Sequence, residues 1–198
     1  MIKTIILDLN KVLVAYKRID EDYQKTFGIS QDKFWEPREM FFNDYITAKI
    51  NLDEFLLKIM KINQIDENKL SDAKKLHEKN LSLAPEMKDL LDSLEKKHSL
   101  ILATGDGKES LDIKLNKFGL KQYFKKIYAT CHMKKTKKDI DFYREILSKS
   151  NLNPGETLFI DDQESYLELA KKLGMHTILF ESPSKLKQDI RKRFNIIV

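Results

Sequence analysis

Cysteine, proline and glycine are scarce in this sequence, and it has no long apolar run. Among 198 residues there are one cysteine, four prolines and six glycines. The single cysteine, Cys131, cannot form a disulfide within the chain, which favours a reducing compartment. No apolar run approaches the roughly 18 residues that a membrane-spanning helix requires, so we expect no membrane partner. The amino terminus also lacks the apolar stretch of a secretion signal, and together these absences predict a cytoplasmic protein.

Charged residues, in contrast, are numerous and nearly balanced. Lysine and arginine number 36 against 31 aspartate and glutamate residues, which gives a formal net charge of +5. Because acidic residues nearly match basic ones and no recognition motif accompanies them, we do not expect a nucleic-acid partner. Hydrophobic residues make up 41% of the chain, which is enough to bury a core. The composition predicts a globular domain, with room for a smaller inserted one.

Short β-like runs and longer helix-like stretches alternate over most of the chain. The runs cover residues 2–7, 99–103, 127–129, 157–160 and 177–180. This alternation is typical of an α/β domain with a parallel sheet. Nearly every run ends in a polar residue, and the carboxyl edge of an open parallel sheet is where ligands bind. A helix that begins at Pro85 is expected to pack on the sheet through Met87, Leu90, Leu91 and Leu94.

The stretch from about residue 16 to residue 82 interrupts this alternation. It is too long for a crossover helix and contains no convincing strand, so we expect an all-helical insertion. Asn51 and Glu54 have the spacing of a capping box that opens a helix. The aromatic residues expected to supply the insertion's own small core are Trp35, Phe41, Phe42 and Tyr45.

Three carboxylates follow predicted strands and are expected at the same sheet edge. Asp8 ends the first run, and Asp161 and Asp162 end another. A carboxylate at this edge can attack a phosphoryl group as a nucleophile. Adjacent carboxylates repel one another unless a cation lies between them, and Mg²⁺, which prefers oxygen ligands, fits that role. Taken singly, Asp8 is better explained as a surface residue that ends a strand, and the pair as the start of a helix.

Two further segments carry groups that suit an anionic ligand. Thr104 and Gly105 follow the second run and precede a helix, so a hydroxyl and free backbone N–H groups can face an anion there. An ordinary tight turn explains the glycines about as well. The lysine-rich run 134–138 follows the third strand, and one of its ammonium groups can neutralise phosphate charge. For most of these lysines a solvated charged surface is the simpler interpretation.

Taken in chain order, these features resemble the motifs of the haloacid dehalogenase-like (HAD) hydrolase superfamily. The motifs are Asp8-Leu9-Asn10-Lys11-Val12-Leu13-Val14, Thr104, Lys137 and Phe159-Ile160-Asp161-Asp162. The resemblance implies a Rossmann-like parallel sheet with helices on both faces, formed by residues 1–15 and 83–198. Residues 16–82 are similar in position and size to the superfamily's helical cap. Within the superfamily, the chain looks most like small sugar-phosphate phosphatases of the α-D-glucose-1-phosphate phosphatase type.

The resemblance also implies a role for each motif residue. Asp8 is the expected nucleophile, and Thr104 with the Gly105 N–H binds the phosphoryl group. Counting from the flanking segments on either side identifies Lys137 as the lysine that steadies both charges. Mg²⁺ is expected on Asp8, on the backbone carbonyl of Asn10, and on Asp161 or Asp162, directly or through water. The expected activity is hydrolysis of a small phosphorylated metabolite, by a monomer or a homodimer.

Asn10 is the main departure from the superfamily's pattern. The similar phosphatases usually have a second Asp there, which protonates the leaving oxygen and then activates water. An amide does not titrate near neutral pH and can do neither. Three interpretations stay open, namely a slow phosphatase, a phosphatase with a replacement acid, and a catalytically inactive protein that serves as a binding module.

Overall fold

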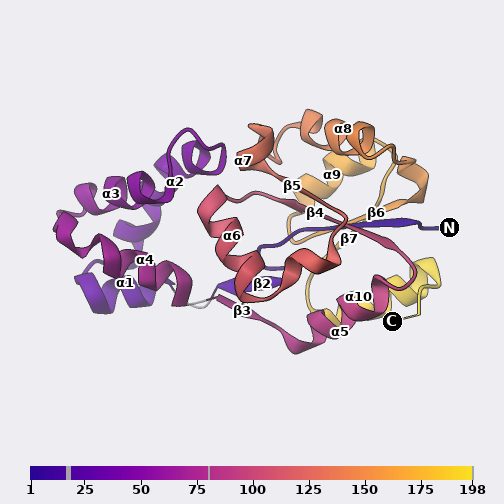
Figure 1. The fold of residues 1–198 in the computed structure, drawn as a ribbon, viewed down its shortest axis with the longest axis horizontal. Helices are drawn as coiled ribbons and strands as arrows, with labels where there is room; N and C mark the ends of the chain where they lie inside the picture. Colours follow the sequence, from indigo (N-terminus) through magenta and orange to yellow (C-terminus); the bar gives the residue numbers. More distant parts are fainter. Residues whose placement is uncertain (17–18, 80, 198) are drawn as a thin grey trace.

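A five-stranded parallel sheet forms the centre of the protein in a computed structural model that describes residues 1–16, 19–79 and 81–197 (Figure 1). Residues 17, 18 and 80 of the predicted insertion therefore lie outside the described residues. The strands are β1 (Thr4–Leu7), β4 (Ser99–Thr104), β5 (Lys126–Ala129), β6 (Thr157–Asp161) and β7 (His176–Leu179). Their order is β5-β4-β1-β6-β7, and each predicted run coincides with one of them. The predicted α/β fold with a parallel sheet is confirmed.

Helices cover both faces of this sheet (Figure 1). One face carries α5 (Pro85–Leu94), α6 (Lys108–Lys117) and α10 (Pro183–Phe194), and the other carries α8 (Ile140–Lys149) and α9 (Glu164–Lys172). Side chains alternate along β1, so Ile5 and Leu7 join the first hydrophobic cluster and Ile6 joins the second. Burial of each such side chain contributes about 1.5–3 kcal/mol. The apolar positions predicted for α5 are all buried, namely Met87, Leu90, Leu91 and Leu94.

A separate group of helices lies between β1 and α5 in the sequence. It consists of α1 (Ile19–Phe27), α2 (Gln31–Ile46), α3 (Leu52–Ile62) and α4 (Leu70–Lys79), which we call the cap. Its own hydrophobic cluster includes Tyr23, Phe34, Tyr45, Phe55 and Ile59. The predicted capping box at Asn51 and Glu54 is present, with both hydrogen bonds formed.

Trp35 does not lie in the centre of the cap as the sequence predicted. It is 36% exposed, whereas Tyr45 is buried and Phe41 and Phe42 are partly buried. The indole N–H of Trp35 donates to the Asp20 carboxylate, 3.4 Å away, and the Arg38 guanidinium lies 5.1 Å from the ring. Because an indole carries a polar N–H, it is stable at the rim of a core where that group finds a partner.

A two-stranded antiparallel ribbon joins the cap to the sheet. It consists of β2 (Val14–Tyr16) and β3 (Leu81–Leu83), and Val14 pairs with Leu83. The prediction that residues 16–82 contain no strand is therefore wrong at both ends. Each strand has only three residues, and its partner is more than 60 residues away in the sequence, so no turn signal marks the pair. The predicted boundaries at residues 15/16 and 82/83 fall inside this ribbon.

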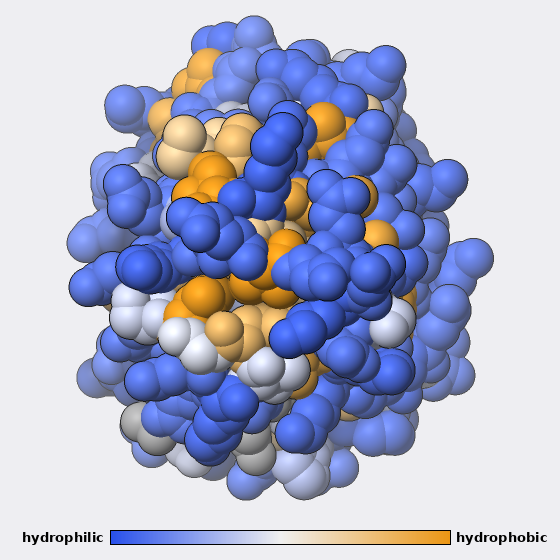
Figure 2. Space-filling model, turned by 90° about the vertical axis from the view of Figure 1, so that its left-hand side faces the viewer, coloured by the Kyte–Doolittle hydropathy of each residue, from blue (hydrophilic) through white to orange (hydrophobic). Residues whose placement is uncertain are grey.

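The cap faces the carboxyl ends of the parallel strands. The N-terminus lies at the opposite end of β1, so this strand and its parallel neighbours run toward the cap (Figure 1). Figure 2 shows the outer end of the cap, where a small apolar area is surrounded by hydrophilic side chains. Among the described residues, no helix combines the length and apolar character needed to cross a bilayer.

Cap and core meet at the start of α6. The backbone N–H of Ser110 donates to the Tyr45 hydroxyl over 3.3 Å, and the Ser110 hydroxyl lies 3.1 Å from Nε2 of His77. Gly107 precedes α6, and a Cβ added there would lie 2.2–2.6 Å from atoms of the Tyr45 ring. The ring cannot easily give way, because it is buried and stacks on Phe55 with 4.7 Å between the centroids. The contact therefore requires glycine at position 107.

We expect the substitution Gly107→Ala to destabilise the protein by about 1–3 kcal/mol, since its methyl group overlaps the Tyr45 ring. Urea unfolding measures the change. Gly155→Ala is the matched control, because its added Cβ would have its nearest neighbour at 3.5 Å. In a Tyr45→Ala background, Gly107→Ala should lower the free energy of unfolding by less. An equal loss with and without the Tyr45 ring would contradict the explanation.

Candidate active site

The register of the sheet brings two predicted carboxylates side by side. Leu7 pairs with Ile160, so Asp8 and Asp161 lie level with each other just beyond β1 and at the end of β6. The Asp8 N–H donates to the Ile160 carbonyl over 3.0 Å, which holds the backbone of the carboxylate against β6. One oxygen from each of Asp8, Asp161 and Asp162 lies within 4.8 Å of the other two.

Lys137 supplies the cation of this cluster. Its Nζ lies 2.6 Å from the Asp8 carboxylate and also donates to Asp161. The loop before it leaves the short helix α7 (Thr130–Met133) through Lys134, whose φ of 53° is left-handed. The Tyr143 hydroxyl of α8 then donates to the Lys137 carbonyl over 3.0 Å. The loop thus aims one lysine of the 134–138 run inward, while Lys134 and Lys138 are exposed.

Burial dominates the electrostatics of these groups. It raises the pKa of Asp8 to about 7; the Lys137 charge opposes this rise, and the Asp161 charge adds to it. Burial likewise raises the pKa of Asp161, although Lys137 lowers it. For Lys137, burial alone would lower the pKa, but the Asp8 and Asp161 charges outweigh it and raise the pKa. The Lys137 ammonium is therefore charged at neutral pH, but its one positive charge does not fully neutralise the negative charge of the ionised carboxylates.

The donor set suits a divalent cation. When the three carboxylates are ionised, the Lys137 charge leaves two negative charges uncompensated, and Lys11 adds only an exposed ammonium 3.6 Å from Asp162. Octahedral Mg²⁺ holds oxygen ligands about 3–4 Å apart, so a small contraction of the cluster would accommodate it. Asp162 is only partly buried and lies on the solvent side of the group. Hard carboxylate oxygens at this spacing fit Mg²⁺ better than a softer metal.

The predicted anion-binding residues adjoin the same cluster. Thr104 is fully buried, and among the described residues its hydroxyl oxygen has no hydrogen-bond partner. Gly105 lies next to the Lys137 side chain, since a Cβ added to it would be 3.7 Å from Cδ of that lysine. A buried hydroxyl without a partner is costly, so it favours a ligand that accepts its hydrogen bond.

Asn10 is held by two residues to which sequence reasoning assigned no role. Its side-chain oxygen accepts from Lys114 over 2.8 Å, and its amide nitrogen lies 3.4 Å from the Asp106 carboxylate. Lys114 also forms an ion pair with Asp106. Asp106 follows the Thr104-Gly105 turn and could have been suspected from that position. Lys114 carried no sequence signal, because a lysine in a helix ordinarily faces solvent.

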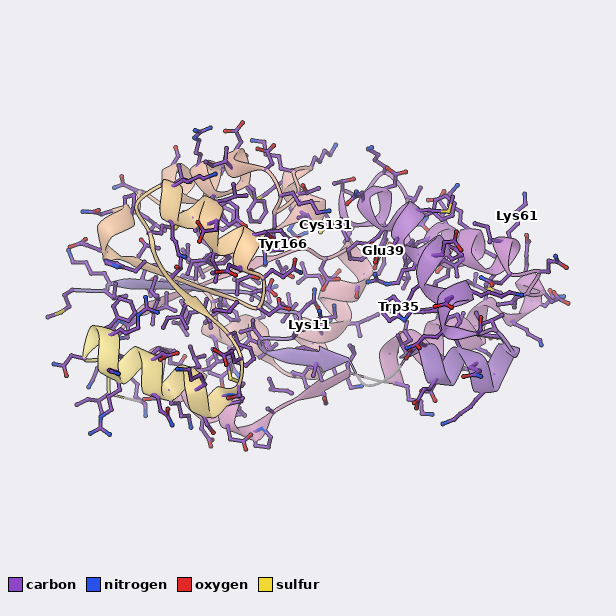
Figure 3. The ribbon with its side chains drawn as sticks, turned by 180° about the vertical axis from the view of Figure 1, so that it is seen from behind. Lys11, Trp35, Glu39, Lys61, Cys131 and Tyr166 are labelled. Atoms are coloured by element: carbon purple, nitrogen blue, oxygen red, sulfur yellow. The ribbon has the colours of Figure 1, made fainter. Side chains whose placement is uncertain are left out.

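Tyr166 is a further neighbour that the sequence did not single out. Lys137 Nζ lies 5.0 Å from the centre of its ring, and burial raises the pKa of its hydroxyl. Figure 3 shows Tyr166 and Lys11 at the end of the sheet domain that is nearer the cap. Trp35 and Glu39 lie on the part of the cap that is nearer the sheet domain. Cys131, by comparison, is buried and its thiol pKa is raised to about 11, so it is a poor nucleophile.

Together these residues can hold a tetrahedral anion next to a nucleophile. Asp8 offers the attacking oxygen, while Thr104 and Lys137 offer hydrogen bonds and positive charge. Because the groups are buried and fixed by their neighbours, little reorganisation is needed when charge develops. The arrangement suits transfer of a phosphoryl group to a carboxylate, for which positioning and charge neutralisation are the main requirements.

The chain is similar to one family of sequences and to several solved structures. The sequence model of haloacid dehalogenase-like hydrolases matches residues 6–180. A HAD family enzyme from Bacteroides thetaiotaomicron superposes with a TM-score of 0.80 at 23% identity, over 96% of this chain and 99% of that one. A chain described as a predicted HAD-like family hydrolase from Porphyromonas gingivalis gives 0.77 at 26% identity, over 98% and 100%. The Bacteroides enzyme has also been solved with magnesium and inorganic phosphate.

Two curated relatives match over shorter stretches. Flavin mononucleotide hydrolase 1 from Arabidopsis thaliana is 29% identical over 75 residues, which are 38% of this chain and 31% of that protein. D-ribitol-5-phosphate phosphatase from Bacteroides thetaiotaomicron is 30% identical over 71 residues, or 36% and 34%. The chain thus matches about a third of the length of these relatives. The closer likeness to glucose-1-phosphate phosphatases stays a prediction.

The raised pKa of Asp8 predicts how stability depends on pH when divalent ions are removed. In the unfolded chain Asp8 ionises near 3.8 and in the folded protein near 7, so between these values the folded state binds more protons. The free energy of unfolding should therefore fall as the pH rises through this window. Between pH 5 and pH 8 the fall should be on the order of 2–3 kcal/mol relative to Asp8→Asn.

Urea unfolding of both proteins in EDTA at pH 5 and pH 8 measures this difference. The exposed substitution Asp112→Asn serves as the control and should follow the unmodified protein. Addition of Mg²⁺ at pH 8 should restore the lost stability, since it compensates the ionised carboxylates. A difference between the native protein and Asp8→Asn that stays constant with pH would show that Asp8 does not titrate in this range.

Proposed function

The chain belongs to the haloacid dehalogenase-like hydrolase family, and we propose that it is a Mg²⁺-dependent phosphatase of small phosphorylated metabolites that acts through a phosphorylated Asp8. Sugar phosphates are the substrates we favour. The observation that carries the proposal is the buried cluster in which Lys137 bridges Asp8 and Asp161. A metal-free hydrolase would not need the third carboxylate of Asp162 within 4.8 Å of both.

Each residue has a defined task in the proposed reaction. An Asp8 oxygen attacks the phosphorus, the bond from phosphorus to the leaving oxygen breaks, and the leaving group departs with the electron pair. Thr104 and the Gly105 N–H orient the phosphoryl oxygens, while Lys137 offsets their charge and that of Asp8. Water then attacks the phosphorus, the bond to Asp8 breaks, and phosphate is released with the carboxylate restored.

The metal would be held by Asp8, by the backbone carbonyl of Asn10, and by Asp161 or Asp162, directly or through water. Bound there, Mg²⁺ would neutralise charge on the phosphoryl oxygens. The single positive charge of Lys137 does not neutralise the three carboxylates of Asp8, Asp161 and Asp162. A dianionic phosphate would therefore be repelled unless a further cation were bound. The proposal therefore requires the metal for substrate binding as well as for the reaction.

The names of similar proteins support a phosphorylated metabolite as the substrate. Two of the curated relatives are described as acting on flavin mononucleotide and on D-ribitol 5-phosphate, both of which are phosphate monoesters of small molecules. The cap covers the carboxyl edge of the sheet and can exclude water from a bound substrate. A non-catalytic binding module is the alternative, and the first experiment below separates the two.

We expect phosphate release from phosphorylated metabolites to require Mg²⁺ and to vanish in Asp8→Asn, because the amide cannot attack phosphorus. Lys137→Met should lower kcat/KM by at least about 100-fold, as loss of a fixed charge-stabilising group does. Release of inorganic phosphate, measured with sugar 1-phosphates, sugar 5-phosphates and acetyl phosphate, tests both expectations. Lys138→Met is the matched control, since it removes an exposed lysine next in the chain.

Asn10→Asp tests the chemistry at position 10. A carboxyl group there can pass a proton to the leaving oxygen, so release from substrates with poor leaving groups should rise by about 100-fold. Silence of the native protein with activity in Asn10→Asp would mean that the site is intact but lacks its acid. Silence in both, with folded protein and Mg²⁺ present, would instead support the binding module.

A further inference from the structure

A fully buried lysine lies beside the candidate site without belonging to the cluster around Asp8. Lys114 of α6 is 0% exposed, and its ammonium pairs with the Asp106 carboxylate, which is also buried. Its second acceptor is the side-chain oxygen of Asn10, 2.8 Å away. A lysine is rarely buried so completely unless specific partners hold it. These contacts join the loop after β1 to the turn after β4.

The charge of Lys114 determines which way the Asn10 carboxamide faces. Its oxygen accepts from the ammonium, and its nitrogen lies 3.4 Å from an Asp106 oxygen. The opposite orientation would place an N–H group against the ammonium and a carbonyl oxygen against the carboxylate, and both contacts are repulsive. Among the described residues, none besides Asp106 accepts from the amide nitrogen, so its second hydrogen is left for a bound substrate.

The position of Asn10 relates this amide to the leaving group. Asp8 directly follows β1, Asn10 lies two residues further on, and the strand runs toward the cap (Figure 1). In an in-line displacement the leaving oxygen departs on the side of the phosphorus opposite the attacking oxygen. That side faces the cap, and the chain continues from Asp8 to Asn10 beyond the end of β1, with Asp106 3.4 Å from the Asn10 amide nitrogen. The Asn10 amide can therefore donate a hydrogen bond to the departing oxygen, but it cannot transfer a proton.

We propose that Lys114, held by Asp106, is a positioning residue that fixes the Asn10 carboxamide as a hydrogen-bond donor. The consequence is selection for phosphate monoesters whose leaving oxygen departs as an anion, such as acyl phosphates, anomeric sugar phosphates and aryl phosphates of acidic phenols. This inference rests on the proposed phosphatase activity. The phosphorus–oxygen bond breaks, the leaving oxygen keeps the electron pair, and its proton comes later from solvent.

The first test compares two aryl phosphates that differ mainly in the leaving group. With Mg²⁺, kcat/KM should fall at least ~100-fold from 4-nitrophenyl phosphate to phenyl phosphate, because no proton transfer assists the more basic phenolate. The ratio kcat/KM is chosen because it reports the steps up to phosphorylation of Asp8, whatever limits the second step. Similar values for the two esters would overturn the inference and leave the phosphatase standing. Hydrolysis of sugar phosphates in the panel above without hydrolysis of 4-nitrophenyl phosphate would overturn the inference alone, whereas no phosphate release from any of these substrates, in the native protein and in Asn10→Asp, would remove the phosphatase as well.

The second test asks whether Lys114 acts through Asn10. Lys114→Met should lower kcat/KM for 4-nitrophenyl phosphate by about 10–100-fold, as a slight misplacement of a reacting group does. KM and inhibition by inorganic phosphate should change little, because Thr104 and Lys137 still bind the phosphoryl group. The control is Lys117→Met, which removes an exposed lysine from the same helix.

A double-mutant cycle separates positioning from a general loss of structure. If Lys114 acts through Asn10, then Lys114→Met should add almost nothing in an Asn10→Ala background. Independent, additive losses would overturn the proposed coupling. Should circular dichroism show that Lys114→Met does not fold, Asp106→Asn replaces it in the cycle, since it keeps the shape of the side chain while weakening the hold on Lys114.

Discussion

A single buried ammonium holds together a group of side chains that would otherwise repel one another. Lys137 donates to both Asp8, which directly follows β1, and Asp161, which ends β6, and all three side chains are almost completely buried. Removing one partner of such an arrangement leaves a buried charge uncompensated, which typically costs about 3–5 kcal/mol. The left-handed turn at Lys134 and the Tyr143 hydrogen bond both serve to keep this ammonium in place. Burial of these charges therefore lowers the stability of the fold but holds a positive charge in a fixed position at the site.

Much of the fold could be predicted because its signals are local. Five apolar runs with polar ends indicated the parallel sheet, and the capping box at Asn51 and Glu54 marked the start of α3. The ribbon formed by β2 and β3 could not be predicted from such local signals. Its strands are short, and they pair across the whole sequence of the intervening helices. Trp35 was misplaced because hydrophobicity alone does not tell whether an indole finds a partner for its N–H at the rim.

In the candidate site, too, the residues with a local sequence signal could be predicted, whereas the residue buried by a tertiary contact could not. Asp8, Thr104, Lys137 and Asp161 follow strands or a recognisable loop, so their order along the chain was enough to bring them to one edge. Lys114 lies in the middle of a helix with a mixed pattern of charges, and nothing nearby in the sequence distinguishes it from Lys117. Its burial results from where α6 meets the loop after β1, a tertiary contact between residues 104 positions apart.

The ribbon between cap and core has a consequence for how such a protein changes over evolution. Val14 and Leu83 are paired neighbours, so the chain leaves the core and returns to it at adjacent points. An insertion whose two ends meet can be shortened, enlarged or exchanged while the sheet and its register persist. The cap's hydrophobic cluster is separate from the two that flank the sheet. The cap and the residues at the sheet edge can therefore diverge at different rates within one gene.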